Sequence, residues 1–153
     1  HLYGLACTGL RFFTVYGPGQ RPDLAIHQFV KKISNDQPLV LFGDGQTARA
    51  YTYIDDTVSG IFNALEYCLQ NSGVYTTVNL GNNHPVKLHE LVDIIYAAMG
   101  KEKNLVYESM QPGDVDITFA DISKAAALFN YKPAIGITEG IGKFIEWYRN
   151  VHK

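Results

Sequence analysis

The stretch Leu10-Arg11-Phe12-Phe13-Thr14-Val15 is mainly apolar and aromatic, and Tyr16-Gly17-Pro18-Gly19 follows it directly. An apolar run of this length that ends at Gly and Pro residues is typical of a buried strand that leads into a loop. The sequence after it alternates between further strand patterns and helix patterns. This alternation predicts an α/β fold.

The other elements are predicted from periodicity and turn residues. A helix is expected over residues 24–35, where apolar residues recur at helical spacing. A second helix starts at Asp55-Asp56, and one of its faces carries Val58, Ile61, Phe62, Leu65 and Leu69. A third helix is predicted from residue 88 to Gly100, and two more are predicted to begin at Ser123 and at Thr138 as their N-caps. Strands are predicted at 39–42, 49–53, 78–80 and 104–108. Residues 109–118 are predicted to form a polar loop. These strands are too few for a complete doubly wound sheet.

Composition excludes several classes of protein. The length of 153 residues fits one domain. Charged residues make up only 18% of the sequence, and this low share is compatible either with a face that packs on another domain or with a compact single domain. A net charge of −2 without a basic cluster predicts no nucleic-acid binding. No run reaches the roughly 18 apolar residues of a membrane span, and no signal peptide is recognised. Cys7 and Cys68 are expected to be buried, reduced thiols, as in the cytoplasm.

Two motifs of nucleotide-dependent oxidoreductases do not occur in the sequence. None of the 14 glycines forms the G-x-G-x-x-G or G-x-x-G-x-x-G loop that binds a dinucleotide pyrophosphate. None of the 10 tyrosines is followed by Lys four residues later. No metal site is predicted either, because the histidines are scattered and Asp93 stands where a zinc-binding helix opened by His89-Glu90 would need its second His.

Three residues have side chains suited to a nucleotide, and each has a plain structural alternative. Arg49 offers a planar fork to two phosphate oxygens, or it forms a surface salt bridge with Asp44 or Asp55. Phe42 could stack on a flat base or pack in the core. Asp114 could accept hydrogen bonds from a ribose diol, or it could be an ordinary turn residue.

Three motifs in order resemble the extended short-chain dehydrogenases of the NAD-dependent epimerase/dehydratase family. They are residues 10–18, then Arg49-Ala50-Tyr51-Thr52-Tyr53-Ile54-Asp55-Asp56, then Gln111-Pro112-Gly113-Asp114. The resemblance is closest to UDP-glucuronate 4-epimerases and UDP-glucose 4-epimerases. It implies that residues 1–153 are the C-terminal sugar-nucleotide-binding portion: a partial Rossmann-type sheet edge plus a small mixed α/β substrate-binding domain.

The same resemblance implies that the NAD-binding Rossmann half is absent from this chain. The catalytic Tyr-x-x-x-Lys pair would then lie upstream of His1, and no catalytic residue would lie within residues 1–153. NAD would be bound mainly by that N-terminal half. Phe13 and Tyr16 match the loop that closes over the nicotinamide, so they are the cofactor contacts that the resemblance gives to this chain.

Substrate contacts follow from the resemblance residue by residue. Thr14 matches a position that touches the sugar. Arg21 matches a position near the substrate carboxylate or phosphates, although Arg21-Pro22-Asp23 could also be a simple helix entry. Leu39 and Phe42 are the first and last residues of a segment that is similar to the uracil platform.

The remaining substrate contacts concern the diphosphate and the nucleoside. Arg49 matches the diphosphate arginine, and Gln111 and Asp114 match contacts to uridine and ribose. The chain departs from the family pattern at Ala50, where the family usually has Asp. A carboxylate that would support Arg49 is therefore missing.

The implied reaction is the epimerisation of a UDP-sugar at C4. An upstream Tyr takes the 4-hydroxyl proton while NAD takes the hydride, and the 4-keto sugar turns about its diphosphate before the hydride returns. This chain would hold the UDP, and the full-length enzyme is expected to be a cytoplasmic homodimer. Two alternatives stay open: a stand-alone, non-catalytic UDP-sugar-binding module, and a part of a nucleotide-sugar dehydratase or decarboxylase.

Overall fold

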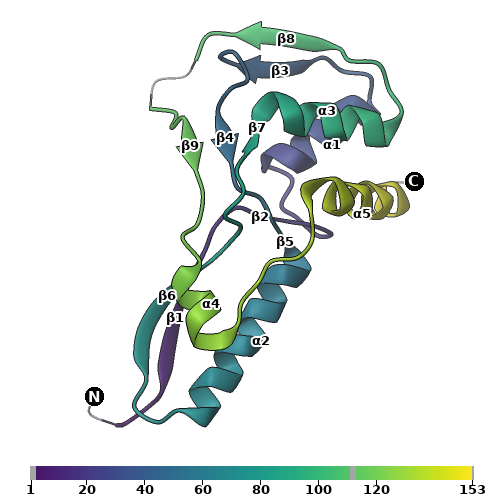
Figure 1. The fold of residues 1–153 in the computed structure, drawn as a ribbon. Helices are drawn as coiled ribbons and strands as arrows, with labels where there is room; N and C mark the ends of the chain where they lie inside the picture. The colour runs from purple at the N-terminus through teal and green to yellow at the C-terminus, as the bar shows by residue number, and fades with distance from the viewer. Residues whose placement is uncertain (1–2, 111–112, 153) are drawn as a thin grey trace.

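A computed structural model describes residues 3–110 and 113–152 and confirms the α/β fold (Figure 1). The strands are β1 (Cys7–Phe12), β2 (Val15–Tyr16), β3 (Leu39–Phe42), β4 (Ala48–Arg49), β5 (Thr52–Tyr53), β6 (Tyr75–Leu80), β7 (Val86–Lys87), β8 (Leu105–Glu108) and β9 (Ile117–Thr118). The helices are α1 (Ala25–Ser34), α2 (Ile54–Gln70), α3 (Leu88–Met99), α4 (Ser123–Phe129) and α5 (Ile137–Val151). No helix within the described ranges has the length and the apolar character needed to cross a membrane.

The strands form small sheets in which most neighbours run parallel. β1 pairs with β6, β2 with β5 and β3 with β8, all in parallel. β4 pairs antiparallel with β7 and parallel with β9. Parallel neighbours need long connections, and the helices lie within those connections.

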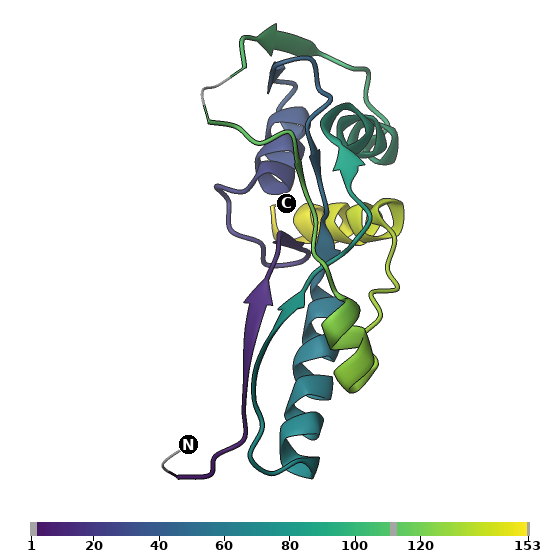
Figure 2. The ribbon, with the colours of Figure 1, turned by 60° about the vertical axis from the view of Figure 1, so that its left-hand side comes forward.

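Buried side chains form two separate clusters, called here the large core and the small core. The large core lies where α1, α3 and α5 pack around β2, β3 and β5, in the upper part of Figure 1. Its members are Tyr16, Ile26, Val30, Ile33, Leu39, Leu41, Tyr51, Tyr53, Leu91, Val92, Ile95, Tyr96, Ile141, Phe144, Ile145 and Tyr148. The small core consists of Ala64, Val78, Leu80, Ala125, Phe129 and Tyr131, in the arm that α2, α4, β1 and β6 form (Figure 2).

The predicted buried strand over residues 10–15 is wrong in its bounds and in its burial. Pairing with β6 begins at Cys7 and ends at Phe12, after which β2 pairs with β5, so the segment serves two different sheets. Phe12 is 52% exposed. The predicted burial of the two cysteines is wrong as well, because Cys7 in β1 is exposed and Cys68 is only partly buried. The predicted strand over 49–53 also divides, because β4 and β5 have different partners. The short β9 lies within the predicted loop over 109–118.

The helices occur where periodicity predicts them, but two predicted N-caps are wrong. Ser123 is the first residue of α4, and the Asp121 carboxylate accepts hydrogen bonds from its N (3.0 Å) and Oγ (2.7 Å). These bonds hold the pKa of Asp121 below its usual range. Thr138 lies inside α5, whose N-cap is Gly136. Gly100 does end α3 as predicted, with the φ of 67° that glycine adopts readily.

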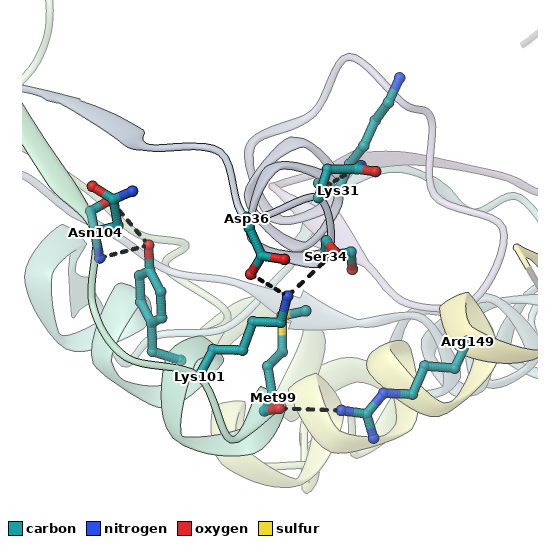
Figure 3. A network of polar contacts seen from close by, with 9 residues as sticks. Lys31, Ser34, Asp36, Met99, Lys101, Asn104 and Arg149 are labelled. Atoms are coloured by element: carbon teal, nitrogen blue, oxygen red, sulfur yellow. Dashed lines mark hydrogen bonds and ion pairs between the residues drawn. The ribbon is translucent and has the colours of Figure 1, made fainter.

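The ends of three helices meet in a network of polar contacts (Figure 3). Lys101, just after α3, donates to the Asp36 carboxylate at 2.6 Å and to the Ser34 carbonyl at 3.3 Å, at the end of α1. Arg149 of α5 donates to the Met99 carbonyl at 3.4 Å. These contacts hold α1, α3 and α5 to one another at the surface of the large core.

One face of α2 is exposed although it is apolar. Its side chains, named here the apolar face of α2, are those of Val58, Ile61, Phe62, Leu65 and Leu69. The residues of this helix that are buried are Asp56, Thr57, Gly60 and Ala64, which are small or polar. The Asp56 carboxylate accepts hydrogen bonds from the Ala134 and Ile135 amides at 3.0 and 3.1 Å, so α2 is held to the segment between α4 and α5.

Candidate functional site

A cavity of about 590 Å³ lies between the start of α1, strand β3 and the segment after β8. Two residues that the sequence predicts as substrate contacts, Phe42 and Asp114, lie in its wall. The remaining wall is contributed by Asp23, Ala25, Gln28, Phe29, Lys32, Val40, Leu41, Leu88 and Glu108. The cavity therefore combines two half-buried aromatic rings, Phe29 and Phe42, with three carboxylates, one lysine and one amide.

Phe42 faces this cavity because of the alternation along β3. Leu39 and Leu41 are buried in the large core, while Val40 and Phe42 are partly exposed. Successive side chains of a strand point to opposite faces, so one face of β3 covers the core and the other lines the cavity. Leu39, also predicted as a substrate contact, has its side chain fully buried in the large core, and its amide donates to the Asn104 carbonyl at 2.9 Å.

Arg49 and Asp114 lie together at one side of the cavity. Arg49 Nη2 donates to Asp114 Oδ1 at 2.7 Å, and its Nη1 donates to the Ala48 carbonyl at 3.0 Å. The two side chains are 25% and 39% exposed, so the pair is accessible to solvent. The salt-bridge alternative predicted Asp44 or Asp55 as the partner of Arg49; the structure shows Asp114 instead.

Arg21 lies at the rim of the same cavity through its contact with Asp23. The guanidinium donates from Nε to Asp23 Oδ1 at 3.0 Å and from Nη2 to Oδ2 at 2.7 Å, and both side chains are largely exposed. This bidentate pair holds the pKa of Asp23 below its usual range and raises the pKa of Arg21. Arg21 also lines a smaller cavity of about 170 Å³ over the loop after β2.

The loop that carries Arg21 is fixed by Gln20 and His27. Gln20 Nε2 donates to the Val15 carbonyl at 3.2 Å, and His27 Nδ1 donates to the Gln20 carbonyl at 2.8 Å. His27 is buried against the rings of Phe144 and Tyr148 in α5. The position of Arg21 therefore depends on β2, through the Gln20–Val15 hydrogen bond, and on α5, through the His27–Gln20 hydrogen bond and the packing of the His27 ring.

Thr14, Phe13 and Tyr16 lie where the chain passes from β1 to β2. Thr14 is exposed, and its carbonyl accepts a hydrogen bond from the Thr52 amide at 2.9 Å. Phe13 is half-buried next to Gly81. Tyr16 is 1% exposed, with Tyr51 and Tyr53 edge-on at 6.3 and 5.6 Å between ring centroids. Burial raises the pKa of the Tyr16 phenol.

The structure thus brings together Phe42, Arg49 and Asp114, with Arg21 at the rim. Gln111 lies outside the described residues. Gln28, Lys32 and Glu108 line the cavity and were not predicted. Gln28 and Lys32 are four residues apart on α1 and share a face, so helical spacing could have grouped them, but nothing in the sequence indicates that this face meets β3.

Comparison with known proteins adds a family and several close relatives. Residues 1–81 match the sequence model of the NAD dependent epimerase/dehydratase family. Protein CapI of Staphylococcus aureus is 40% identical over 167 residues, which cover 100% of this chain and 50% of that protein. The UDP-glucuronate 4-epimerase of Thermodesulfobacterium geofontis is 40% identical over 148 residues, which cover 96% of this chain and 44% of that enzyme.

Solved structures agree with these sequence relatives. The UDP-glucuronic acid 4-epimerase from Bacillus cereus, in complex with UDP-glucuronic acid and NAD, superimposes with a TM-score of 0.85 at 34% identity, over 93% of this chain and 45% of that one. The UDP-glucose 4-epimerase of Thermotoga maritima with UDP-glucose gives a TM-score of 0.87 at 28% identity, over 99% and 48%. The chain spans about half the length of the relatives that it matches.

Proposed function

Because the chain belongs to the NAD-dependent epimerase/dehydratase family, we propose that it is the UDP-sugar-binding part of a UDP-sugar 4-epimerase. The observation that carries this proposal is the Arg49–Asp114 ion pair beside the cavity that Phe42 lines. A UDP-sugar has a flat base, a ribose diol and a diphosphate. An aromatic ring, a carboxylate and a guanidinium fork are the side chains that suit these three parts.

Each of these residues has a distinct part in holding UDP. Phe42 provides the platform for uracil, Asp114 accepts hydrogen bonds from the ribose, and Arg49 turns its fork to the diphosphate. The Arg49–Asp114 pair is partly exposed, so a diphosphate can reach the guanidinium without first opening a buried contact. Binding energy from the UDP handle then positions the sugar, which is the reacting part of the molecule.

The sugar is proposed to lie towards Thr14. The Thr14 carbonyl is bonded to the Thr52 amide, and three residues of extended chain, about 10 Å, separate Thr52 from Arg49. That distance fits a sugar that is attached to the diphosphate. Arg21 is exposed and already binds one carboxylate, that of Asp23, so a sugar carboxylate can take the same fork geometry. UDP-glucuronate and UDP-galacturonate, or UDP-glucose and UDP-galactose, are the proposed substrate pairs.

NAD is proposed to be held mainly by a further part of the enzyme. The residues present here do not form a dinucleotide site on their own, because the sequence has no Gly-rich loop and the Tyr16 side chain lies inside the large core. Phe13 and the backbone around Tyr16 are the contacts that this chain would add. The catalytic Tyr-x-x-x-Lys pair is proposed to lie in that same further part, and the complete enzyme to be a cytoplasmic homodimer.

Calorimetric titration of UDP into the chain tests the placement of Arg49. We expect Arg49→Ala to weaken UDP binding by about 2–4 kcal/mol, the usual cost of removing one partner of a charged contact. Arg49→Lys should restore only part of this loss, because an ammonium cannot face two oxygens at once. Arg149→Ala, which removes an exposed arginine of α5, is the matched control. Equal affinity of the parent and the Arg49→Ala variant would show that Arg49 does not contact the diphosphate.

The chain by itself is expected to catalyse no epimerisation. Neither the dinucleotide loop nor the Tyr-x-x-x-Lys pair is present in its sequence. The measurement is chromatographic separation of the C4 epimers after incubation of the chain with NAD and UDP-glucuronate or UDP-galactose. Product above the level of a protein-free blank would contradict the proposal that this chain binds the UDP-sugar while the catalytic residues lie in a further part of the enzyme.

A further inference from the structure

Arg21 and Asp23 are a bonded pair whose two members line different cavities. Asp23 lines the larger cavity, of about 590 Å³, in which the base and the diphosphate are proposed to bind. Arg21 lines the smaller cavity, of about 170 Å³, over the loop after β2. The guanidinium donates to both oxygens of the Asp23 carboxylate, at 3.0 and 2.7 Å, so the Nε–Nη2 side of its fork is occupied from within the chain.

The two cavities differ in charge. Among the described residues, three carboxylates and one lysine line the larger cavity: Asp23, Glu108, Asp114 and Lys32. Arg21 is the one charged side chain among the described residues that line the smaller cavity. A carboxylate on the sugar would be repelled by the acidic wall of the larger cavity and would meet a cation in the smaller one.

The backbone around the pair is held, whereas its side chains are free to move. The Arg21 carbonyl accepts a hydrogen bond from the Leu24 amide at 3.2 Å, and the Asp23 carbonyl accepts one from Gln28 Nε2 at 3.0 Å. The side chains of Arg21 and Asp23 are 73% and 62% exposed, and exposed ion pairs contribute little to stability. The pair can therefore open by side-chain rotation alone, with the loop in place.

We propose that Asp23 is an internal competitor of the substrate, which occupies the Arg21 fork until the carboxylate of a uronic acid sugar takes its place. This inference rests on the proposed function and separates the two substrate pairs left open there. A neutral sugar offers only hydroxyl groups, which bind a guanidinium more weakly than a carboxylate does. UDP-glucose would therefore leave the Arg21–Asp23 pair closed, and UDP-glucuronate would open it.

Exchange of one carboxylate for another fits the geometry better than addition of a second. Arg21 meets Asp23 through Nε and Nη2, so a second carboxylate would be left with the Nη1 side. Two carboxylates on one guanidinium lie close together, and like charges at short distance oppose each other. Exchange gives the incoming group the parallel N–H groups that suit a carboxylate.

Calorimetric titration of UDP, UDP-glucose and UDP-glucuronate into the chain tests the inference. Asp23→Asn removes the charge of the competitor with little change of shape. We expect the affinity for UDP-glucuronate, relative to that for UDP, to rise roughly two- to fivefold, which is what an exposed ion pair is worth. The affinity for UDP-glucose relative to UDP should not change. Asp36→Asn is the matched control, because Asp36 is also an exposed carboxylate in an ion pair, with Lys101 at 2.6 Å.

Two further measurements show whether Asp23 acts through Arg21. In an Arg21→Ala background, Asp23→Asn should no longer change the ratio of the two affinities, since nothing is left to compete for. NMR of the Arg21 Nε–H group, which donates to Asp23, follows the exchange directly. Its signal should shift on addition of UDP-glucuronate and should stay in place with UDP-glucose.

Three results would overturn the inference and leave the proposed function standing: an unchanged affinity ratio in Asp23→Asn, the same rise in the Arg21→Ala background, or an Arg21 signal that bound UDP-glucuronate does not move. A chain that binds neither UDP nor the two UDP-sugars would overturn the proposed function, and this inference with it. Both side chains are exposed, so the variants are expected to fold as the parent does.

Discussion

Arg49 is a residue at which a structural role and a binding role can be separated. Its pair with Asp114 is accessible to water, and pairs of this kind contribute about 0–1 kcal/mol to stability. Arg49→Ala should therefore change the free energy of unfolding by no more than about 1 kcal/mol, while UDP affinity falls much further. Urea unfolding measures the first quantity. A loss of several kcal/mol there would make Arg49 a structural residue.

Tyr131 makes the stability of the chain depend on pH in the alkaline range. Its ring is buried, and its hydroxyl donates to the Gly81 carbonyl at 3.1 Å. Burial, followed by the Asp56 carboxylate, raises the pKa of Tyr131 to about 12. An unfolded tyrosine ionises near pH 10, so this contribution is complete below about pH 10 and is lost between about pH 10 and 12, at about 1.4 kcal/mol per pH unit.

The measurement is the free energy of unfolding, from urea titrations at several pH values above about 9. It should fall less steeply with pH in Tyr131→Phe than in the parent. Burial also raises the pKa of Tyr51, which contributes to the fall in both proteins. Tyr3→Phe, at a ring that is 84% exposed, is the control and should keep the parental slope. A parental slope in Tyr131→Phe would exclude this role.

At the residue scale, the sequence indicates which of the proposed binding residues lie near one another better than it indicates their contacts. The sequence alone singles out Phe42, Arg49 and Asp114, and the structure places them in one region. The partner of Arg49 was not predictable, because Asp114 lies 65 residues further along the chain and no local pattern connects them. The burial of the Tyr16 side chain was not predictable either, since a tyrosine in a Gly-rich loop could face the core or the solvent.

At the scale of the elements, two helical glycines respond in opposite ways to the same substitution. Alanine is favoured over glycine in a helix by about 1 kcal/mol. In α2, however, a Cβ at Gly60 would come within 2.8 Å of the Tyr131 ring. Overpacking of this kind costs about 1–3 kcal/mol, so Gly60→Ala should destabilise the chain. Gly142→Ala in α5, where a Cβ meets nothing within 4 Å, should stabilise it by about 0.5–1 kcal/mol.

Thermal or urea unfolding of the two glycine variants measures both effects in one experiment. A stabilised Gly60→Ala variant would mean that Tyr131 moves aside without cost. A destabilised Gly142→Ala variant would mean that α5 has a neighbour at that position. Either result would correct the description of how α2 or α5 packs.

Helices were predicted from sequence more reliably than strands, for a physical reason. A helix satisfies its backbone hydrogen bonds within itself, so periodicity is enough to find α1, α2, α3 and α5. A strand is defined by its partner, and the run over residues 10–15 divides because β1 and β2 pair with different strands. Periodicity also shows which side chains of α2 share a face, but not whether that face has a partner.

At the scale of the whole molecule, the two cores should differ in local stability. The small core has fewer members and no aromatic layer of its own beyond Phe129 and Tyr131, and it lies against a two-stranded sheet. Amides of β1 and β6 should therefore exchange with solvent at least about tenfold faster than those of β3 and α5. Hydrogen exchange read by mass spectrometry or NMR checks this. Equal protection in both regions would show that the molecule unfolds as one unit.

The two cores are also interleaved along the chain. The polypeptide leaves the arm for the large core between β1 and β2 and returns to the arm between β5 and α2. It leaves again between β6 and β7 and returns between β9 and α4. It leaves the arm for the last time between α4 and α5. Neither core is therefore encoded by a continuous stretch. A recombination breakpoint between two related genes that falls between Ala64 and Tyr131 would join unlike parents inside both cores at once, and one between Tyr16 and Ala64 would divide the large core. Crossovers that exchange this unit between relatives should consequently survive only ahead of β1.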